Sequence, residues 1–486
     1  MGLVFNQSFK NIVIIFLGFA IGGINVLFLY THFLEAEYYG LITFLLSSSN
    51  ILTPLLIFGV QHSIIKFFSS YKNKIDRDNF LITAIVLPLL VIIPLAFIGT
   101  LCYEYISDLL SKENVIIKKY TYFIFFIAVL TGYFEVFFAW SKVQLKSVFG
   151  GFIREIFTRI CVTILLFAVY FKWLDNDQFI QALVLVYFLR MILIMMYAFT
   201  LYFPKVKSFK LPQNIREILS FSFYIILAGS AGTILLEIDK FMIPQMEKIE
   251  QVAYYSVGVF IATVIAIPSR AMQQIINPIT AKELNEGNLK EVESLYKKSS
   301  INLLIVGGLL FLLINININE LYLLINKPEY SVGVYIVLMI SISELFKLSL
   351  GTNGAILTNS KYYKVFFYFS ITMAFSVIVL NRILIEILGI EGAALATLAV
   401  VMLFSFVKVI YLNKKLRMHP YSKNTMIIFS IILVLFFSFY FLSFDIHPFL
   451  NILLKSVLVS SIFIFLIIKL KLSKDINKLL PKWLIK

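Results

Sequence analysis

Charged side chains interrupt several long apolar runs of this sequence, and they are the residues best suited to chemistry. Arg190 stands in the run 179–203 with no acidic residue within a helical turn, and Glu135 is the one charge in the run 120–141. Arg270 and Gln274 are four residues apart, which places both on one face of a helix. A charge at the centre of a bilayer costs about 2.5–3.5 kcal/mol, so it needs a partner or a water-filled cavity. The pattern therefore predicts a polar site inside a largely apolar protein.

Two further pairs of charges are spaced to lie together on helices. Glu155 and Arg159 are four residues apart, and Glu344 and Lys347 are three apart. Such pairs either neutralise each other on the helix surface or face a cavity together. An arginine presents a planar set of donors that matches phosphate oxygens, so a cationic cavity would suit an anionic substrate.

The candidate site combines these residues. The predicted substrate-binding cations are Arg154, Arg159, Arg190, Arg270 and Lys347. The predicted counter-ions or coupling-ion ligands are Glu135, Asp239, Glu344 and Gln274. Simpler roles stay open: Arg154 and Arg270 would also serve as anchors at the inner membrane surface, and Glu135 as the salt-bridge partner of an arginine on a neighbouring helix. Lys455 is expected to extend its side chain outward to the interface.

Other kinds of site have little support. The two cysteines, Cys102 and Cys161, lack metal-ligand spacing, and the four histidines are scattered. No GxxxxGK[ST] or GxGxxG pattern occurs, so we expect no nucleotide, metal or other cofactor. Asp175-Asn176-Asp177 superficially mimics an acidic metal-binding pattern, but so short a pattern is common in loops. We therefore expect a protein that is not an enzyme.

Composition places this site in a membrane protein. Of 486 residues, 60% are hydrophobic and 14% are charged, against about 25% charged in soluble domains. The mean hydropathy is +0.91. A helix needs about 20 apolar residues to span a bilayer, and it satisfies its own backbone hydrogen bonds. The sequence predicts an all-α polytopic membrane protein with about 14 transmembrane helices. The predicted spans are 12–33, 41–65, 80–103, 120–141, 150–172, 179–203, 217–239, 252–278, 301–318, 331–357, 363–387, 391–412, 425–443 and 448–468.

The distribution of lysine and arginine predicts the orientation. With the N-terminus placed inside, the inner segments carry 29 of the 42 basic residues and the outer segments carry eight. Such an excess marks cytoplasmic loops. We therefore expect both termini in the cytoplasm, and we attribute the net charge of +15 to topology and lipid contact rather than to nucleic-acid binding. The longest connection, 279–300, is expected to form an amphipathic helix on the inner surface.

A weak internal repeat relates two halves of the chain. Tyr38-Tyr39-Gly40 is matched by Tyr254-Tyr255-Ser256, 216 residues later, and Ser141-Lys142 by Ser360-Lys361, 219 residues later. An even number of helices in each half orients the halves alike, as in transporters built from parallel repeats. We therefore predict one six-helix lobe at 1–206, a second at 207–418, and a terminal helix pair with a basic cytoplasmic tail at 419–486.

Four stretches follow one another along the chain in a recognisable order. They are Glu37–Leu41 with Gly59, Gln61 and Ile64–Phe68; Glu237–Ile243; Val252–Val257 running to Pro278-Ile279; and Leu388–Thr397. Together they resemble the polysaccharide flippase family of the multidrug/oligosaccharidyl-lipid/polysaccharide exporter superfamily.

The resemblance implies a function and partners. Such proteins move undecaprenyl-pyrophosphate-linked oligosaccharides across the bacterial cytoplasmic membrane by alternating access, for surface polysaccharide such as O-antigen or capsule. The resemblance implies contact with that lipid-linked oligosaccharide, with membrane lipids and with polysaccharide polymerase and chain-length proteins. The family supplies no invariant substrate motif, so the site residues rest on the charge pattern alone.

Other functions remain open. One is a cation-coupled multidrug exporter of the same superfamily, although these usually have twelve helices. Another is an exporter of a different lipid-linked precursor, such as lipid II. Hydropathy does not distinguish such an exporter from a polysaccharide flippase. A membrane glycosyltransferase or O-antigen polymerase is less favoured, because the chain has no large outer loop.

Overall fold

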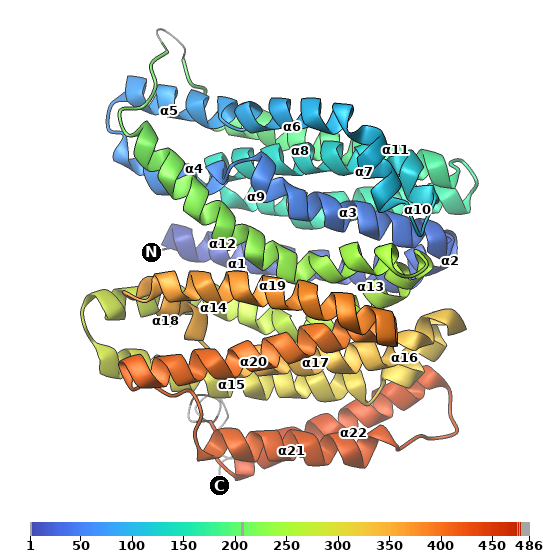
Figure 1. Cartoon of the computed structure of the whole chain (residues 1–486). Helices are drawn as coiled ribbons and strands as arrows, with labels where there is room; N and C mark the ends of the chain where they lie inside the picture. The colour runs from blue at the N-terminus through green and yellow to red at the C-terminus, as the bar shows by residue number, and fades with distance from the viewer. Residues whose placement is uncertain (1, 206–208, 474, 476, 478–486) are drawn as a thin grey trace. The chain divides into compact units, whose positions relative to one another are not determined.

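The computed structural model describes residues 2–205, 209–473, 475 and 477. Its described residues form helices and no strands, and thirteen helical stretches among them are long and apolar enough to cross a membrane. The prediction of an all-α polytopic membrane protein is therefore confirmed. Figure 1 shows long helices lying side by side within each half of the chain.

The chain divides by its contacts into two compact units, residues 1–253 and 254–486. The predicted lobe boundary at 206/207 falls outside the described residues. Helix α12 (Ile215–Met242) packs against α3 (Ala36–Leu56) and α4 (Val60–Phe67), so by contact it belongs with the first unit. The lobes predicted from the repeat, 1–206, 207–418 and 419–486, stay a prediction.

The first unit carries the remaining N-terminal elements. They are α1 (Gly2–Ile24), the π-helical η1 (Asn25–Leu29), α2 (Tyr30–Phe33), η2 (Phe68–Ser70), α5 (Lys74–Val86), α6 (Leu89–Leu101), α7 (Tyr103–Leu110), α8 (Ile116–Val143), α9 (Ser147–Phe152), the π-helical η3 (Ile153–Phe157), α10 (Thr158–Tyr170), α11 (Asn176–Leu201) and η4 (Ile243–Gln245). Buried aromatic residues, among them Phe80, Phe134 and Trp140, form much of its core. Helix α13 (Glu250–Thr263) crosses from the first unit to the second.

The predicted second span is broken rather than continuous. Phe58 and Gly59 adopt positive φ angles of 49° and 62°, which ends α3 and starts α4 in a new direction. A Cβ on Gly59 would lie 2.7 Å from the Ile225 side chain and 3.1 Å from the Ser222 carbonyl oxygen of α12. Glycine therefore provides both the turn and the close approach of α12.

The predicted fifth span is helical but is not among the thirteen candidate spans. Residues 147–170 run through α9, η3 and α10, and every 18-residue stretch within them contains Arg154, Glu155 and Arg159. A stretch with three charged residues is too polar to be recognised as a membrane span from its length and composition alone. The difference between the predicted and observed numbers of spans thus falls on a helix with two candidate site residues, Arg154 and Arg159.

The second unit contains the remaining elements. They are η5 (Val264–Ala266), α14 (Ile267–Asn285), α15 (Leu289–Asn315), α16 (Ile318–Ile325), η6 (Pro328–Gly333), α17 (Val334–Ser349), α18 (Asn353–Asn359), α19 (Tyr363–Leu388), α20 (Ile390–Leu416), α21 (Lys423–Tyr440) and α22 (Pro448–Lys469). Here α20 packs against α17 and α19, and α21 packs against α15 and α22.

The amphipathic surface helix predicted at 279–300 is wrong. Residues 279–285 continue α14, and residues 289–300 begin α15, which runs on to Asn315. The turn between them is made at Gly287, whose φ is +74°, and Asn288 caps α15 by accepting a hydrogen bond from Glu291 N. The charges of this segment therefore sit on the ends of two long helices.

Lys455 does not extend to the interface. Its side chain is 2% exposed, and its Nζ lies 2.7 Å from Oε1 of Glu320 on α16. Lys455 also donates to the Ile316 carbonyl oxygen at 2.9 Å, and Asn451 donates to Glu320 at 3.2 Å. This buried ion pair joins α22 to α16. The sequence analysis missed it because Glu320 fell in an assumed loop.

Removing one partner of this pair is expected to destabilise the protein. Lys455→Met leaves Glu320 as a buried, unpaired charge, which costs about 3–5 kcal/mol. We expect a clear fall in the melting temperature of the purified protein in detergent. The double variant Glu320→Gln/Lys455→Met should recover much of the loss, because no lone charge remains. Lys469→Met, at the exposed end of the same helix, is the matched control; equal melting temperatures for Lys455→Met and this control would contradict the account.

Candidate functional site: a charge cluster in the first unit

Two π-helical segments occur where α1 meets the predicted fifth span: η3 packs against α1, and η1 packs against α10. Segment η1 continues α1, and η3 connects α9 to α10. Asn25 of η1 donates a hydrogen bond to the Arg159 carbonyl oxygen at 3.0 Å and accepts one from Thr163 at 2.8 Å. π-Helical segments that interrupt regular helices are frequent at functional sites. The pairing of η1 with the start of α10 therefore draws attention to the side chains around it.

Arg154 joins carboxylates of two helices. Its Nη1 is 3.7 Å from Glu135 Oε1 on α8, and its Nε is 3.2 Å from Glu155 Oε1 on η3. Glu155 also faces Arg159, with 3.4 Å between Oε2 and Nη1. These four side chains remain partly exposed, between 21% and 38%, so they are reachable from outside the helix packing.

Arg159 lies against a glycine face of α1. A Cβ on Gly18 would be 2.6 Å from Arg159 Nη1, and a Cβ on Gly22 would be 3.0 Å from its Nε. Any larger side chain at either position would occupy the space of the guanidinium. The two glycines, four residues apart on one face of α1, thus provide the room in which Arg159 sits.

Arg190 is the most enclosed cation of the region, at 7% exposed. Its guanidinium carbon lies 4.3 Å from the centroid of the Phe134 ring on α8 and 4.7 Å from that of Tyr187. Its Nε has no hydrogen-bond partner within the described part of the chain. Phe134 directly precedes Glu135, so Arg190 packs against the part of α8 that carries this carboxylate.

Lys142 completes the group, and the sequence analysis had assigned it to the inner surface. Its Nζ lies 3.9 Å from the Phe138 ring centroid, and the guanidinium of Arg154 lies 5.2 Å from the same ring. Sequence spacing does not show that Lys142 and Arg154 contact the same aromatic ring. We call these residues the first-unit charge cluster: Glu135, Lys142, Arg154, Glu155, Arg159 and Arg190. Four cations and two carboxylates give it a formal charge of +2.

The predicted residue Asp239 and its neighbour Glu237, both in the first unit, take no part in these ion pairs. Glu237 pairs with Lys240 at 2.7 Å and accepts a hydrogen bond from Asn50 at 3.2 Å. Asp239, on the same helix α12, is buried. Glu237 is therefore neutralised on its own helix, and a coupling-ion role for Asp239 stays a prediction.

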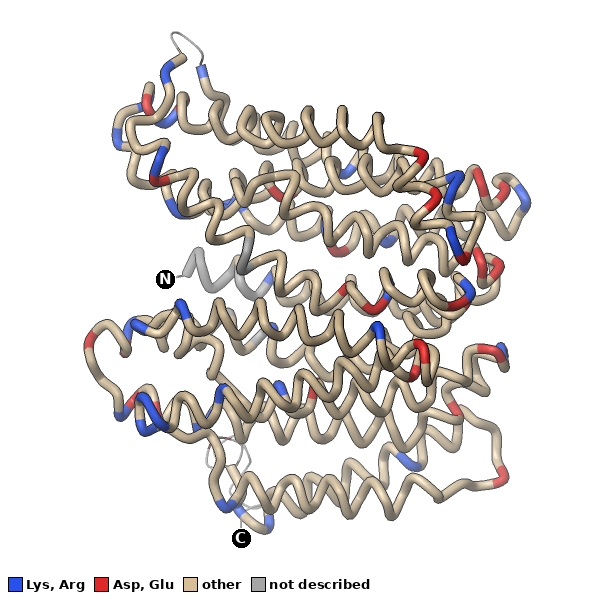
Figure 2. Tube along the Cα trace, viewed as in Figure 1, with Lys and Arg blue, Asp and Glu red and all other residues tan. Residues whose placement is uncertain are grey.

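The predicted residues of the second unit are more scattered. Glu344 and Lys347 pair along α17 at 2.7 Å. Arg270 is exposed on α14 and has no carboxylate within ion-pair distance among the residues described. The side chain of Gln274 lies outside the described residues. Figure 2 shows charged residues gathering toward the helix ends of each unit, so charges along the middle of helices are the unusual ones.

The acidic pattern Asp175-Asn176-Asp177 has a structural role. Asp175 caps α11, accepting from Gln178 N at 2.7 Å. Asp177 accepts from Lys119 and Tyr120 of α8 and, at 3.4 Å, from Tyr38. Both carboxylates are used to fix the start of α11 beside α8, and no group of three potential metal ligands occurs among the described residues.

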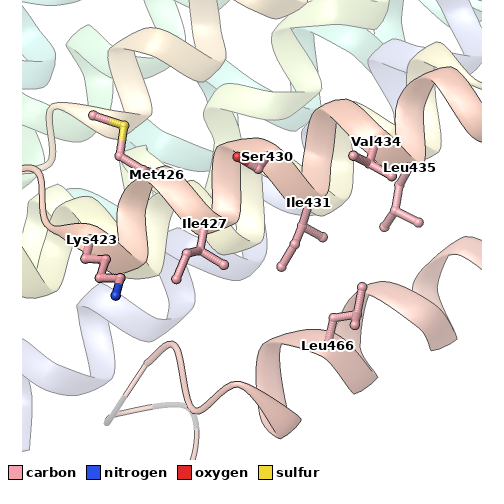
Figure 3. A pocket seen from close by; sticks show the side chains of 8 residues that line it. All are labelled: Lys423, Met426, Ile427, Ser430, Ile431, Val434, Leu435 and Leu466. Atoms are coloured by element: carbon pink, nitrogen blue, oxygen red, sulfur yellow. The ribbon is translucent and has the colours of Figure 1, made fainter.

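An open groove in the second unit is apolar. It has a volume of about 490 Å³ and is lined by residues of α21 and by Leu466 of α22 (Figure 3). Its only polar lining residues are Lys423 and Ser430. A groove of this composition suits hydrocarbon chains and offers almost nothing to a sugar or a phosphate.

The comparisons with known proteins agree with this picture of a membrane transporter. Residues 8–281, more than half of the chain, match the family described as polysaccharide biosynthesis protein. The chain belongs to that family. A search of curated proteins gives no match.

Solved structures show the fold of this family member. The inward closed conformation of the lipid II flippase MurJ is similar over 96% of this chain and 99% of its own, at 15% identity and a TM-score of 0.71. An inward-facing multidrug resistance MATE transporter of the MOP superfamily is similar over 86% of this chain and 95% of its own, at 12% identity and a TM-score of 0.57. A Vibrio cholerae MATE transporter is similar over 86% of this chain and 97% of its own, at 11% identity and a TM-score of 0.56. The chain therefore has the fold of flippases and transporters.

Filling the glycine face of α1 is expected to disturb the cluster. In Gly18→Ala the new Cβ would be 2.7 Å from the Glu155 carbonyl oxygen, a backbone atom that cannot move alone. Such overpacking costs about 1–3 kcal/mol, so we expect a lower melting temperature. Gly99→Ala is the control, because nothing lies within 4 Å of its Cβ position. A melting temperature for Gly18→Ala as high as that for Gly99→Ala would show that α1 and η3 are not in close contact.

Proposed function

We propose that this protein flips undecaprenyl-pyrophosphate-linked oligosaccharide repeat units across the bacterial cytoplasmic membrane by alternating access. The repeat units would supply a surface polysaccharide such as O-antigen or capsule. Membership of the polysaccharide biosynthesis family and the flippase and transporter fold support this proposal.

The observation that carries the proposal is the charge of the first-unit cluster. A pyrophosphate bonded to a lipid at one end and a sugar at the other carries two negative charges, and the cluster carries a formal +2. Its three arginines provide the forked donors that match phosphate oxygens, and Arg190 keeps a buried Nε without a protein partner among the described residues. Glu135 and Glu155 would hold the arginines in place until the phosphates replace them.

The proposal also includes an orientation and partners. The excess of basic residues in alternate connections supports cytoplasmic termini, so the repeat unit would enter from the cytoplasmic leaflet where it is assembled. Release outside would hand the unit to a polysaccharide polymerase and to chain-length proteins. The polyprenyl chain would remain among the lipid tails throughout.

A second candidate is a flippase for another lipid-linked precursor. Its support is the similarity to the lipid II flippase, with a TM-score of 0.71 against 0.57 or less for the two MATE transporters compared here. Both substrates would share the polyprenyl pyrophosphate, so the cluster fits either. A cation-coupled drug exporter fits less well, because a site of net charge +2 repels cationic drugs.

Deletion of the gene from its host separates these functions. We expect complete single repeat units on undecaprenyl pyrophosphate to accumulate, surface polysaccharide to disappear, and the intact gene to restore both. The accumulated units should be protected from a glycosidase added to the periplasm. Accessible units would mean failed polymerisation instead, and unchanged pools would contradict the proposal.

Arg190→Gln tests whether the first-unit charge cluster takes part in the export of repeat units. Losing a charged donor to phosphate is expected to slow export of repeat units by about tenfold or more. Arg382→Gln is the matched control, because Arg382 is 63% exposed and pairs with Glu386 at 4.0 Å. The measurement is the rate at which surface polysaccharide reappears after the gene is induced. Equal rates for both variants, at equal amounts of protein in the membrane, would remove Arg190 from the site.

A further inference from the structure

Lys408 is a further cation placed inside a membrane-spanning helix, and neither the charge pattern nor the family accounts for it. It falls within the predicted span 391–412, although it is one of the 29 basic residues assigned above to the inner segments. The structure places it eight residues before the end of α20, which runs from Ile390 to Leu416. It is six residues before Lys414, and therefore about 9 Å deeper along the helix axis than that surface lysine.

The surroundings of Lys408 leave its charge unneutralised. Its side chain is half-buried, and its Nζ lies 5.6 Å from the ring centroid of Phe366 on α19. The charge of Lys347 on α17 also acts on it, which adds repulsion. Glu344 is bonded to Lys347 at 2.7 Å, and no described carboxylate lies within ion-pair distance of Lys408. The charges of Lys408 on α20 and of Lys347 and Glu344 on α17 sum to +1.

The internal repeat relates Lys408 to Arg190. The two are 218 residues apart, between the repeat offsets of 216 and 219 found for the tyrosine and Ser-Lys pairs. Arg190 lies on α11, which packs against α8, and Lys408 lies on α20, which packs against α17. Each cation contacts an aromatic ring of a neighbouring helix of its own unit. A cation at the same place in each repeat indicates that Arg190 and Lys408 have a common role.

We propose that Lys408, together with Lys347 on the adjoining helix α17, forms an anion-binding site of the second unit that takes the phosphate group of a lipid. An ammonium group has three donors, and contact with a ring leaves some of them available. Lysine binds phosphate as a compact point charge, and an incoming phosphate would relieve the repulsion between the two lysines. The phosphate belongs either to the transported polyprenyl pyrophosphate, in which case the inference rests on the proposed function, or to a resident phospholipid.

The test uses the full-length protein in nanodiscs of phosphatidylcholine, with bound lipids counted by native mass spectrometry. Undecaprenyl pyrophosphate is titrated in one series and phosphatidylglycerol in another. Lys408→Gln is compared with Lys408→Arg, which keeps the charge, and with Lys414→Gln, which removes a surface charge of the same helix. Lys347 is left unchanged, since its removal would leave Glu344 unpaired. Melting temperatures confirm that all variants are folded.

We expect Lys408→Gln to weaken binding of one of the two lipids by about tenfold, while Lys408→Arg and Lys414→Gln stay near the wild type. Loss for undecaprenyl pyrophosphate assigns the site to the transported lipid, and loss for phosphatidylglycerol alone assigns it to a resident phospholipid. Equal affinities of all four proteins for both lipids would overturn the proposal. If the wild type binds no undecaprenyl pyrophosphate, the proposed function fails, and the phosphatidylglycerol series still decides whether this site exists.

Discussion

A charge inside a membrane must be neutralised or given a watery or ionic partner, and this constraint organises the polar part of the protein. A charge that serves stability is fully paired, as with Lys455 and Glu320. Both side chains are almost fully buried, and each makes a further hydrogen bond besides the ion pair. The first-unit charge cluster is built differently. Its two carboxylates are outnumbered by cations, and its ion pairs stay partly exposed. An excess of positive charge that the protein itself does not cancel is what a binding site for an anion requires.

The backbone around the cluster is shaped to keep these cations close together. The π-helical η3 carries Arg154 and Glu155, and the π-helical η1 supplies Asn25, which bonds to the backbone at Arg159. Gly18 and Gly22 let α1 approach the guanidinium of Arg159 without a clash. Phe134 and Phe138, on α8, place rings against Arg190, Lys142 and Arg154. Aromatic rings attract cations without neutralising them, so the positive charge is held but remains available.

Much of the fold, but less of the site, could be predicted from the sequence. Long apolar runs revealed nearly every helix, because lipid demands continuous hydrophobic segments, and the isolated charges Glu135 and Arg190 stood out for the same reason. Lys142, Lys408 and Glu320 were missed, because each lies near the end of an apolar run or in a short helix, where a charge is ordinarily at the surface. Hydropathy measures the composition of a segment, whereas their roles depend on which neighbour covers them. The ends of α14 and α15 were misread for the complementary reason: charges there made two extended helices look like one separate amphipathic helix.

The central claim is that the protein moves a polyprenyl lipid by its pyrophosphate. The most direct test is transport by the purified protein in liposomes, using a fluorescent polyprenyl-pyrophosphate-linked oligosaccharide and the matching neutral polyprenyl glycoside. Transport is followed by the access of a lectin or a membrane-impermeant quencher to the labelled sugar. The account predicts that the protein speeds the crossing of the pyrophosphate-linked lipid far more than that of the neutral one. Equal crossing of the two lipids, or no increase over protein-free liposomes, would contradict it.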